Sequence, residues 1–206
     1  MVQPAAKPEG DVPLRVGEDR AADFAAQFQA SFRVLWLIAV GIIGDASLAE
    51  DVVQEAAIIA LGKLDRFRTG TNFTAWASQI VRNVARNRAR RERRHRAMVT
   101  DPSAIEEQSS VIGSRTEGSR DGVAQGGTEW RQFDGRILQA LADVAEVARS
   151  CLLLRTLEGL EYSEISRLLE IPEGTAMSHV HRTRRYLRDR LADVWEERTG
   201  RPTEGA

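Results

Sequence analysis

Residues 162–191 contain the feature that most constrains the fold, two amphipathic segments separated by a short turn. The first segment, residues 162–169, has its aliphatic residues at the spacing of one helical face. A turn with Pro172 and Gly174 follows, and a second helix is expected to begin at Thr175. Two helices joined by a tight turn form a helix-turn-helix, which presents its second helix to the major groove of DNA.

The second helix is expected to have one apolar face and one face rich in hydrogen-bond donors. At about 100° per residue, the apolar face comprises Ala176, Val180, Leu187, Leu191 and Val194. The opposite face carries Ser178, His181, Arg182 and Arg185, with Thr175 at its edge. An ordinary amphipathic helix with a solvated charged face has the same pattern, so this segment alone leaves both interpretations open.

A second arginine-rich helix is expected over residues 73–96. Its apolar stripe comprises Phe73, Trp76, Ala77, Ile80 and Val84. Its far side carries Ser78, Gln79, Arg82, Arg86 and Arg93. Residues 82–96 contain eight arginines and one acid. Such a run is usually a solvated helix end, but two arginine-rich helices in one chain favour a polyanionic partner such as DNA.

The formal net charge of −1 averages over segments of opposite charge. Basic residues concentrate in the two helices above, whereas acids gather at residues 50–55 and between residues 101 and 129. This asymmetry indicates two kinds of partner: a polyanion for the basic faces, and a basic or mixed protein surface for the acidic one.

Residues 45–64 are expected to form an acidic amphipathic helix that begins at Asp45. Its inward face comprises Leu48, Val52, Ala56, Ile59 and Ala60. Its outward face combines Glu50, Asp51 and Gln54 with the aliphatic residues Ile58 and Leu61. Aliphatic side chains among acids indicate a protein-docking surface with an apolar centre and a polar rim. The alternative is that Ile58 and Leu61 pack under another helix of the same domain.

The chain is expected to be all-α, because alternating β-patterned runs are scarce, and to contain two helical domains. Disorder is expected over residues 1–20, a first domain over residues 21–97, a flexible linker over residues 98–133, a second domain over residues 134–196 and a disordered tail over residues 197–206. No apolar run approaches the ~18 residues that span a bilayer, and the N-terminus lacks a signal-peptide pattern. The only cysteine, Cys151, lies among leucines and is expected to be a small buried hydrophobe. A cytoplasmic protein without membrane insertion is therefore expected.

In this order, the features resemble bacterial RNA polymerase sigma factors of the extracytoplasmic-function (ECF) type. The resemblance extends from around residue 25 to residue 191, interrupted by the linker. It is carried by LAEDVVQEAAIIALGKLDRFRTGTNFTAWASQIVRNVARNRARR and by LLLRTLEGLEYSEISRLLEIPEGTAMSHVHRTRRYLRDRL. It implies a sigma region 2-like helical bundle and a sigma region 4-like helix-turn-helix domain, which together bind core RNA polymerase and direct initiation at promoters with −10 and −35 elements.

The resemblance also implies roles for individual residues. Docking on the β′ clamp helices and β subunit of core polymerase is implied for Asp51, Gln54 and Glu55, with Ile58 and Leu61 on the same surface. Binding of the −10 element is implied for Arg66, Arg68, Asn72, Gln79, Arg82 and Arg86. Binding of the −35 element is implied for Thr175, Ser178, His179, His181, Arg182 and Arg185. An anti-sigma factor would be a further partner.

The loop of residues 66–72 corresponds to the family's loop that holds a base flipped out of the −10 strand. Gly70 allows a tight turn there, and Asn72 can cap the next helix while it offers amide hydrogen bonds. Two other places depart from the family's pattern. Met177 and His179 stand where relatives commonly carry a basic pair, and the segment from Asp143 to Glu146, expected to form a capping box, lacks the usual proline.

The sequence contains no motif that indicates an enzyme, a metal or a cofactor. It has no Gly-x-x-x-x-Gly-Lys loop, no His-Glu-x-x-His pair and no cysteine pair. His179 and His181 would point about 200° apart on a helix and cannot share a metal ion. Two other functions stay open: a helix-turn-helix regulator that never contacts polymerase, which would normally be a dimer, and a degenerate sigma-like protein that binds polymerase or a regulator without reading promoters.

Overall fold

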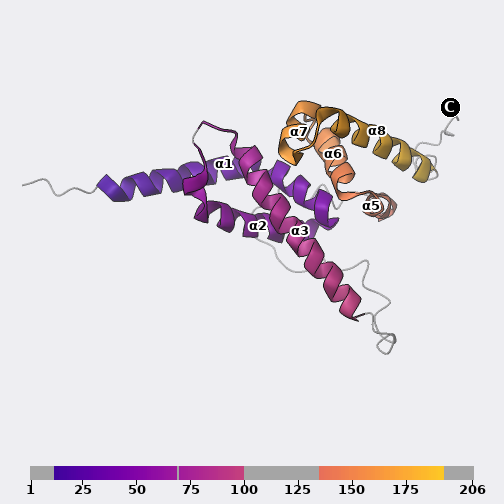
Figure 1. Cartoon of the computed structure of the whole chain (residues 1–206), viewed down its shortest axis with the longest axis horizontal. Helices are drawn as coiled ribbons and strands as arrows, with labels where there is room; N and C mark the ends of the chain where they lie inside the picture. The colour runs from indigo at the N-terminus through magenta and orange to yellow at the C-terminus, as the bar shows by residue number, and fades with distance from the viewer. Residues whose placement is uncertain (1–11, 69, 100–134, 193–206) are drawn as a thin grey trace, which may run out of the picture.

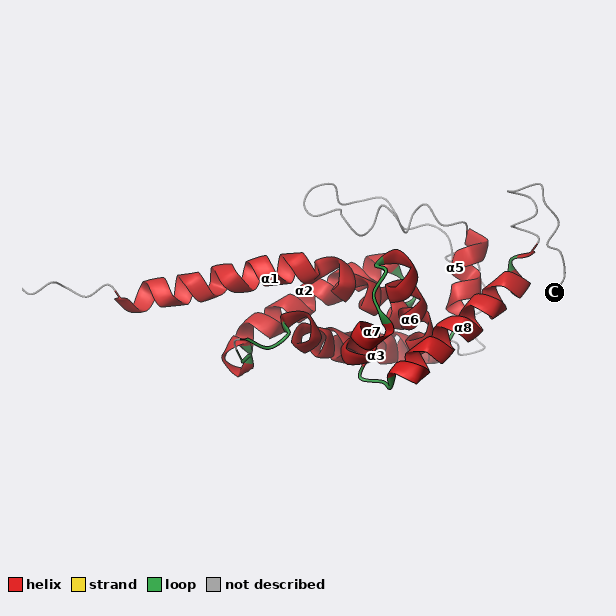
Figure 2. Ribbon diagram, turned by 90° about the horizontal axis from the view of Figure 1, so that it is seen from above, coloured by secondary structure: helices red, strands yellow, loops and turns green. Residues whose placement is uncertain are grey.

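The computed structural model describes residues 12–68, 70–99 and 135–192, and within these ranges the chain is helical and contains no strand (Figures 1 and 2). The elements are α1 (Val12–Ile43), α2 (Ala46–Gly62), the short 3-10 helix η1 (Leu64–Arg66), α3 (Phe73–Val99), α5 (Gly135–Ala142), α6 (Glu146–Leu157), α7 (Tyr162–Leu169) and α8 (Glu173–Arg190). The expected all-α fold class is confirmed.

In the first domain, α1, α2 and α3 pack against one another around an apolar core (Figure 1). An aromatic cluster anchors the start of α3. Phe73 packs against Phe24, Phe28, Phe67 and Trp76, with ring centroids 5.4–6.5 Å apart. Because Phe67 precedes the loop and Phe73 follows it, this cluster fixes both ends of the loop that joins η1 to α3.

Helix α1 begins earlier than expected. It starts at Val12, so the disorder expected over residues 1–20 is wrong for residues 12–20. Pro13 is compatible with this start because no intrahelical hydrogen bond is lost in the first turn of a helix. The expected linker and tail lie almost entirely outside the described residues, except that α3 extends to Val99.

The apolar part of α1 is a core helix. By length and composition alone, Arg20–Ile43 could cross a membrane, which the sequence reasoning did not expect. Half of its most apolar window is buried inside the protein, however, and residues 35–40 are almost completely covered. The helices α2, α3 and α6 pack against α1, and this burial accounts for the composition.

Helix α2 begins as expected after Asp45, whose carboxylate accepts hydrogen bonds from the backbone N–H groups of Ser47 (2.8 Å) and Leu48 (3.0 Å). Its buried face comprises Ala49, Val52, Val53, Ala56 and Ala60. Leu48 and Ile59, expected on this face, are only partly buried. Because this face packs against α1 and α3, the opposite face of α2 lies towards solvent.

The second domain contains the helix-turn-helix. Helix α7 has the bounds expected from the sequence, and a capping box formed by Glu161 and Glu164 begins it. The turn is left-handed at Glu170, with φ of 55°. Helix α8 begins at Glu173 rather than at Thr175. The recognition helix is therefore longer at its N-terminal end than expected.

The capping box expected at Asp143 and Glu146 does not form. Ala145 is the N-cap residue of α6, and no side chain caps the helix. The Glu146 carboxylate instead pairs with Arg86 of α3 at 3.2 Å, and Asp143 accepts a hydrogen bond from Tyr186 at 3.4 Å. Both carboxylates therefore contact other helices, α3 and α8, instead of capping α6.

The two domains pack against each other, which the sequence did not predict. Helix α6 lies on α1 and α7 lies on α3, and the buried side chains form one continuous cluster across both domains (Figures 1 and 2). Cys151 is fully buried in this cluster, as expected, and burial raises the pKa of its thiol to about 12.

Candidate nucleic-acid and protein interfaces

The outward face of α8 is accessible over most of the expected −35 residues. Ser178, His181, Arg182 and Arg185 are exposed, whereas Thr175 and His179 are partly buried. The opposite face buries Ala176, Val180 and Thr183. The structure therefore brings Ser178, His181, Arg182 and Arg185 together on one side of the recognition helix, with donor groups that suit base edges and phosphates.

Two uncharged positions flank this face. Met177 is 53% exposed. Burial, and secondarily the neighbouring Arg182, lower the pKa of His179 from its ordinary value. Because an unperturbed histidine titrates near pH ~6.5, this imidazole is neutral at neutral pH. Neither position supplies the positive charge that would add a phosphate contact.

The outward face of α2 has the composition expected of a docking surface. Ile58 is 75% exposed and Leu61 is 49% exposed. The polar side chains beside them, Asp51, Gln54 and Glu55, are exposed as well. The alternative in which Ile58 and Leu61 pack under a helix of the same domain is wrong. An aliphatic centre with a polar and acidic rim remains available to another protein.

The loop between η1 and α3 is held at both ends, and its described polar residues Arg68, Thr71 and Asn72 are exposed. The Asn72 side-chain oxygen accepts a hydrogen bond from the backbone N–H of Ala75 at 2.9 Å, so the expected helix cap is confirmed. Gly70 has φ of 87°, a conformation that glycine adopts without strain. Arg66 and Arg68 are exposed on either side of the half-buried Phe67.

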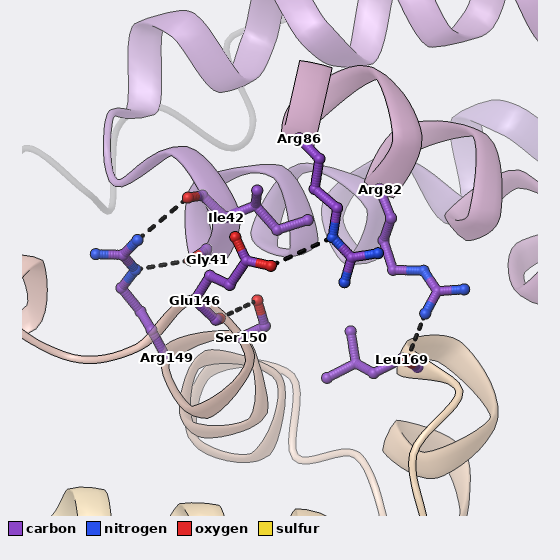
Figure 3. Close-up of polar contacts among 8 residues, drawn as sticks. All are labelled: Gly41, Ile42, Arg82, Arg86, Glu146, Arg149, Ser150 and Leu169. Carbon is purple, nitrogen blue, oxygen red and sulfur yellow. Dashed lines mark hydrogen bonds and ion pairs between the residues drawn. The ribbon is translucent and has the colours of Figure 1, made fainter. Parts of the chain in front are cut away.

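The face of α3 that carries the remaining −10 residues is partly covered by the second domain, as Figure 3 shows around Arg82 and Arg86. Gln79 is exposed and Arg86 is partly buried, but Arg82 is only 5% exposed and Ser78 is fully buried. Ser78 and Arg82, which were expected on the side of α3 away from its apolar stripe, are therefore buried.

The covering group is the C-terminal end of α7. Arg82 donates a hydrogen bond to the carbonyl oxygen of Leu169 and pairs with the Glu170 carboxylate at 2.8 Å. Gln79 donates to the other Glu170 oxygen, and Ser78 donates to the Leu168 carbonyl oxygen at 3.0 Å. The last carbonyls of a helix lack intrahelical partners and carry partial negative charge, which explains why an arginine lies there. The hydrogen bond from Arg82 lowers the pKa of Glu170.

A second arginine holds α6 against the end of α1 (Figure 3). Arg149 donates from Nε to the Gly41 carbonyl oxygen at 2.7 Å and from a terminal nitrogen to that of Ile42 at 3.3 Å. Its other terminal nitrogen donates to the Leu141 carbonyl oxygen at 3.0 Å. Burial lowers the pKa of Arg149, against the opposing charge of Glu146. The guanidinium thus supplies, in place of water, hydrogen-bond donors to carbonyl groups at the ends of α1 and α5.

Gly41 allows this close approach. A Cβ atom at Gly41 would lie 2.1 Å from the Ser150 hydroxyl oxygen and 2.7 Å from the Ser150 Cα, so α1 and α6 could not pack at this distance with any larger residue. Arg33 adds a further contact between the domains, because it pairs with Glu158 and donates to the Leu157 carbonyl oxygen at 3.2 Å.

Three residues of the contact between the domains were not singled out from the sequence: Arg149, Gly41 and Arg33. Arg149 carried a usable signal, since it is one charged residue inside the apolar run of residues 147–154. No feature of the sequence indicated a contact for Gly41 or Arg33. The second half of α3 extends beyond the second domain, and its exposed arginines, which were also not assigned to a site, are Arg90, Arg91, Arg93 and Arg94 (Figure 1).

In the part of the chain that the structure describes, no three His, Cys, Asp or Glu side chains lie close enough together to hold a metal ion.

A helical domain with an acidic, aliphatic-centred face, followed by a helix-turn-helix domain, defines a protein of the sigma-70 class of transcription factors. Residues 28–95 match the family model of Sigma-70 region 2, and residues 134–187 match that of Sigma-70, region 4. The chain belongs to the ECF sigma factors of bacterial RNA polymerase. Members of this family bind core RNA polymerase and promoter DNA, and they are regulatory proteins rather than enzymes.

Two relatives agree with this assignment, and a solved structure has a similar fold. The chain is 34% identical to the ECF RNA polymerase sigma-E factor of Escherichia coli over 142 residues, 68% of this chain and 72% of that protein. It is 29% identical to the RNA polymerase sigma-H factor of Pseudomonas aeruginosa over 183 residues, 88% and 91% of the two chains. The fold is similar to that of the sigma factor RpoE from Bartonella quintana, solved in complex with the anti-sigma factor NepR, with a TM-score of 0.53, 22% identity and coverage of 82% and 96%.

Proposed function

We propose that this chain docks on core RNA polymerase through the outward face of α2 and directs initiation at promoters whose −35 element is read by α8. The observation that carries the proposal is the presence of two exposed faces of different chemistry on one chain. Ile58 lies 75% exposed in a polar and acidic rim, and Arg182 and Arg185 lie exposed on the recognition helix. The first suits a protein, and the second suits DNA.

The −10 element is proposed to bind the loop before α3 and the adjoining face of α3. Arg66 and Arg68 are exposed on the loop, and the Asn72 amide lies at its end beside the first turn of α3. These groups suit a base turned out of a DNA strand and the phosphates beside it. Action on polymerase would place the protein in the cytoplasm, and an anti-sigma factor is proposed as its regulator by similarity to RpoE and its complex.

The test is transcription with purified core polymerase on a pool of genomic DNA fragments, with and without the protein. Discrete transcripts that depend on the protein are the expected result. Asp51→Ala with Gln54→Ala should remove them and weaken binding to core polymerase. Arg182→Ala should change which fragments are transcribed without changing binding to core polymerase.

One alternative has a specific observation in its favour. The uncharged Met177 and the neutral His179 weaken the case for strong −35 binding, and they favour a degenerate sigma-like protein. Binding to core polymerase without any protein-dependent transcript would support that alternative. DNA binding without polymerase binding would support an independent regulator instead.

A further inference from the structure

Met177 is a large apolar side chain that lies exposed on the first half of the recognition helix α8. Ala176, Val180 and Leu187 of the same helix lie in or against the buried core, whereas Met177 is 53% exposed. One exposed methionine on an ordinary surface needs no explanation. Its place among the DNA-facing side chains of α8 gives it a chemical role.

The helical geometry of α8 places Met177 at the end that enters the groove. At about 100° per residue, Met177 lies about 40° round the helix from His181, one turn further along, and Ser178 follows it in the chain. Arg184 and Arg188 are exposed on the same side of α8, with Arg184 about 10 Å further along the axis. The first residues of a recognition helix contact base edges, and later cations reach phosphates. Met177 therefore occupies a base-contacting position.

The chemistry of a methionine selects one kind of base edge. Its thioether has no hydrogen-bond donor and is only a weak acceptor, so it gains little from the polar edges of guanine, adenine or cytosine. Thymine is the base that presents an apolar group, its C5-methyl, in the major groove. An unbranched, flexible side chain can adapt its end to such a group. A lysine or arginine at this position would instead favour guanine or a phosphate.

We propose that Met177 is a specificity-determining residue that contacts the C5-methyl group of one thymine in the −35 element. The proposal rests on the proposed function of α8, but it needs only duplex binding by that helix and not docking on polymerase. On this flank of α8, apolar contact with a base takes the place of a positive charge. The chain therefore gains sequence preference where it lacks a phosphate contact.

The surroundings of Met177 favour DNA over a protein as its partner. Methionine is also common at protein interfaces, where apolar side chains group together. On α2, Ile58 and Leu61 form such a group. Met177 instead lies among the hydroxyl, imidazole and guanidinium groups of Ser178, His181 and Arg184, all of them exposed. A polar and cationic setting of this kind suits a nucleic acid.

The first step of the test is selection from a pool of double-stranded oligonucleotides with a randomised central segment. Selection is run with the full chain alone and with the full chain bound to core polymerase. In the selected duplex, deoxyuridine then replaces each thymidine in turn, which removes the C5-methyl and keeps every hydrogen-bonding group. At one position the parent should lose about threefold to fivefold in affinity, the effect of one buried methyl group.

Variants at position 177 assign that loss to one side chain. Met177→Gln has nearly the same length but a polar end, so it should bind the thymine and uracil duplexes equally at that position. Met177→Leu stays apolar and should keep a preference for thymine. Arg184→Ala is the contrast on the same flank, since it should weaken binding to both duplexes by the same factor and reduce the salt slope by about one.

The outcomes separate this proposal from the proposed function. Equal binding of thymine and uracil duplexes by the parent at every position overturns the proposal, and so does failure to enrich any sequence. A sensitivity to uracil that is the same in Met177→Gln as in the parent at every position also overturns it. Weaker binding of Met177→Gln to core polymerase, with unchanged selection of DNA, would overturn it in favour of a protein contact. Thymine-dependent duplex binding without protein-dependent transcripts refutes the proposed function and supports the role of Met177.

Discussion

Truncation of Ile58 is a direct test of the docking surface on α2. This side chain is 75% exposed, so a partner can bury about three quarters of a group whose complete burial is worth ~1.5–3 kcal/mol. Ile58→Ala should therefore weaken binding to core polymerase by ~1–2 kcal/mol, roughly five- to thirtyfold. Ile58→Glu should weaken it further, because a charge would enter the apolar centre beside carboxylates that are already present.

Two comparisons sharpen this prediction. Leu61 is 49% exposed, so Leu61→Ala should weaken binding to core polymerase less than Ile58→Ala does. The free energy of unfolding should change by less than ~0.5 kcal/mol in Ile58→Ala, because the side chain packs little in the free protein. Val53→Ala on the opposite, buried face of α2 is the matched control, and it should lower stability.

The assay is an equilibrium titration of labelled core polymerase with each variant, together with urea denaturation of the variant alone. Parental affinity in both Ile58→Ala and Ile58→Glu would refute the docking assignment. A loss of affinity that accompanies an equal loss of stability would refute the physical argument, because the effect would then arise from unfolding rather than from a missing contact.

Three further predictions concern the second domain. Arg149→Ala should lower the free energy of unfolding by ~3 kcal/mol in urea denaturation, because several buried carbonyl groups lose a charged donor, and Arg149→Lys should recover only part of it. In a promoter-binding titration, Arg182→Ala should weaken binding to the preferred −35 sequence by ~1–3 kcal/mol. Arg185→Ala should instead weaken binding to all sequences and reduce the salt slope by about one. Equal effects of both variants on every sequence would contradict the assignment of Arg182 to bases and Arg185 to phosphates. The pKa of His179 is lowered in the folded chain, so below pH ~6.5 the unfolded chain takes up a proton more readily than the folded chain does. The free energy of unfolding should therefore fall as the pH decreases below ~6.5, and His179→Gln should make that fall less steep. The same pH dependence of unfolding in His179→Gln and in the parent would contradict this prediction.

Elements that depend on local sequence were predictable. Helix α7 matched its expected bounds, Asp45 and Asn72 cap the helices that follow them, and Ile58 is exposed as its place on the helical period indicated. Each of these follows from residues within one or two helical turns of one another. The local signal was sufficient because no distant segment competes with it.

Features that depend on distant segments were not predictable. Arg82 meets Leu169, 87 residues away in the chain, and helical periodicity carries no information about that pairing. Its position on the polar side of α3 was correctly inferred, but a polar side faces another domain as readily as solvent when the partner supplies helix-end carbonyls. Glu146 likewise left its expected local cap for Arg86, 60 residues away.

The burial of Cys151 has a practical consequence for experiments in solution. With a pKa of about 12, only ~10⁻⁵ to 10⁻⁴ of this thiol is ionised near neutral pH, whereas an ordinary cysteine is ionised to a few per cent. Peroxide and maleimide reagents attack the ionised form, so the chain's one native thiol is chemically silent while the core stays closed. A cysteine introduced on any exposed helix face can therefore carry a dye or spin label selectively, and slow labelling of Cys151 itself would time the opening of the core around α6.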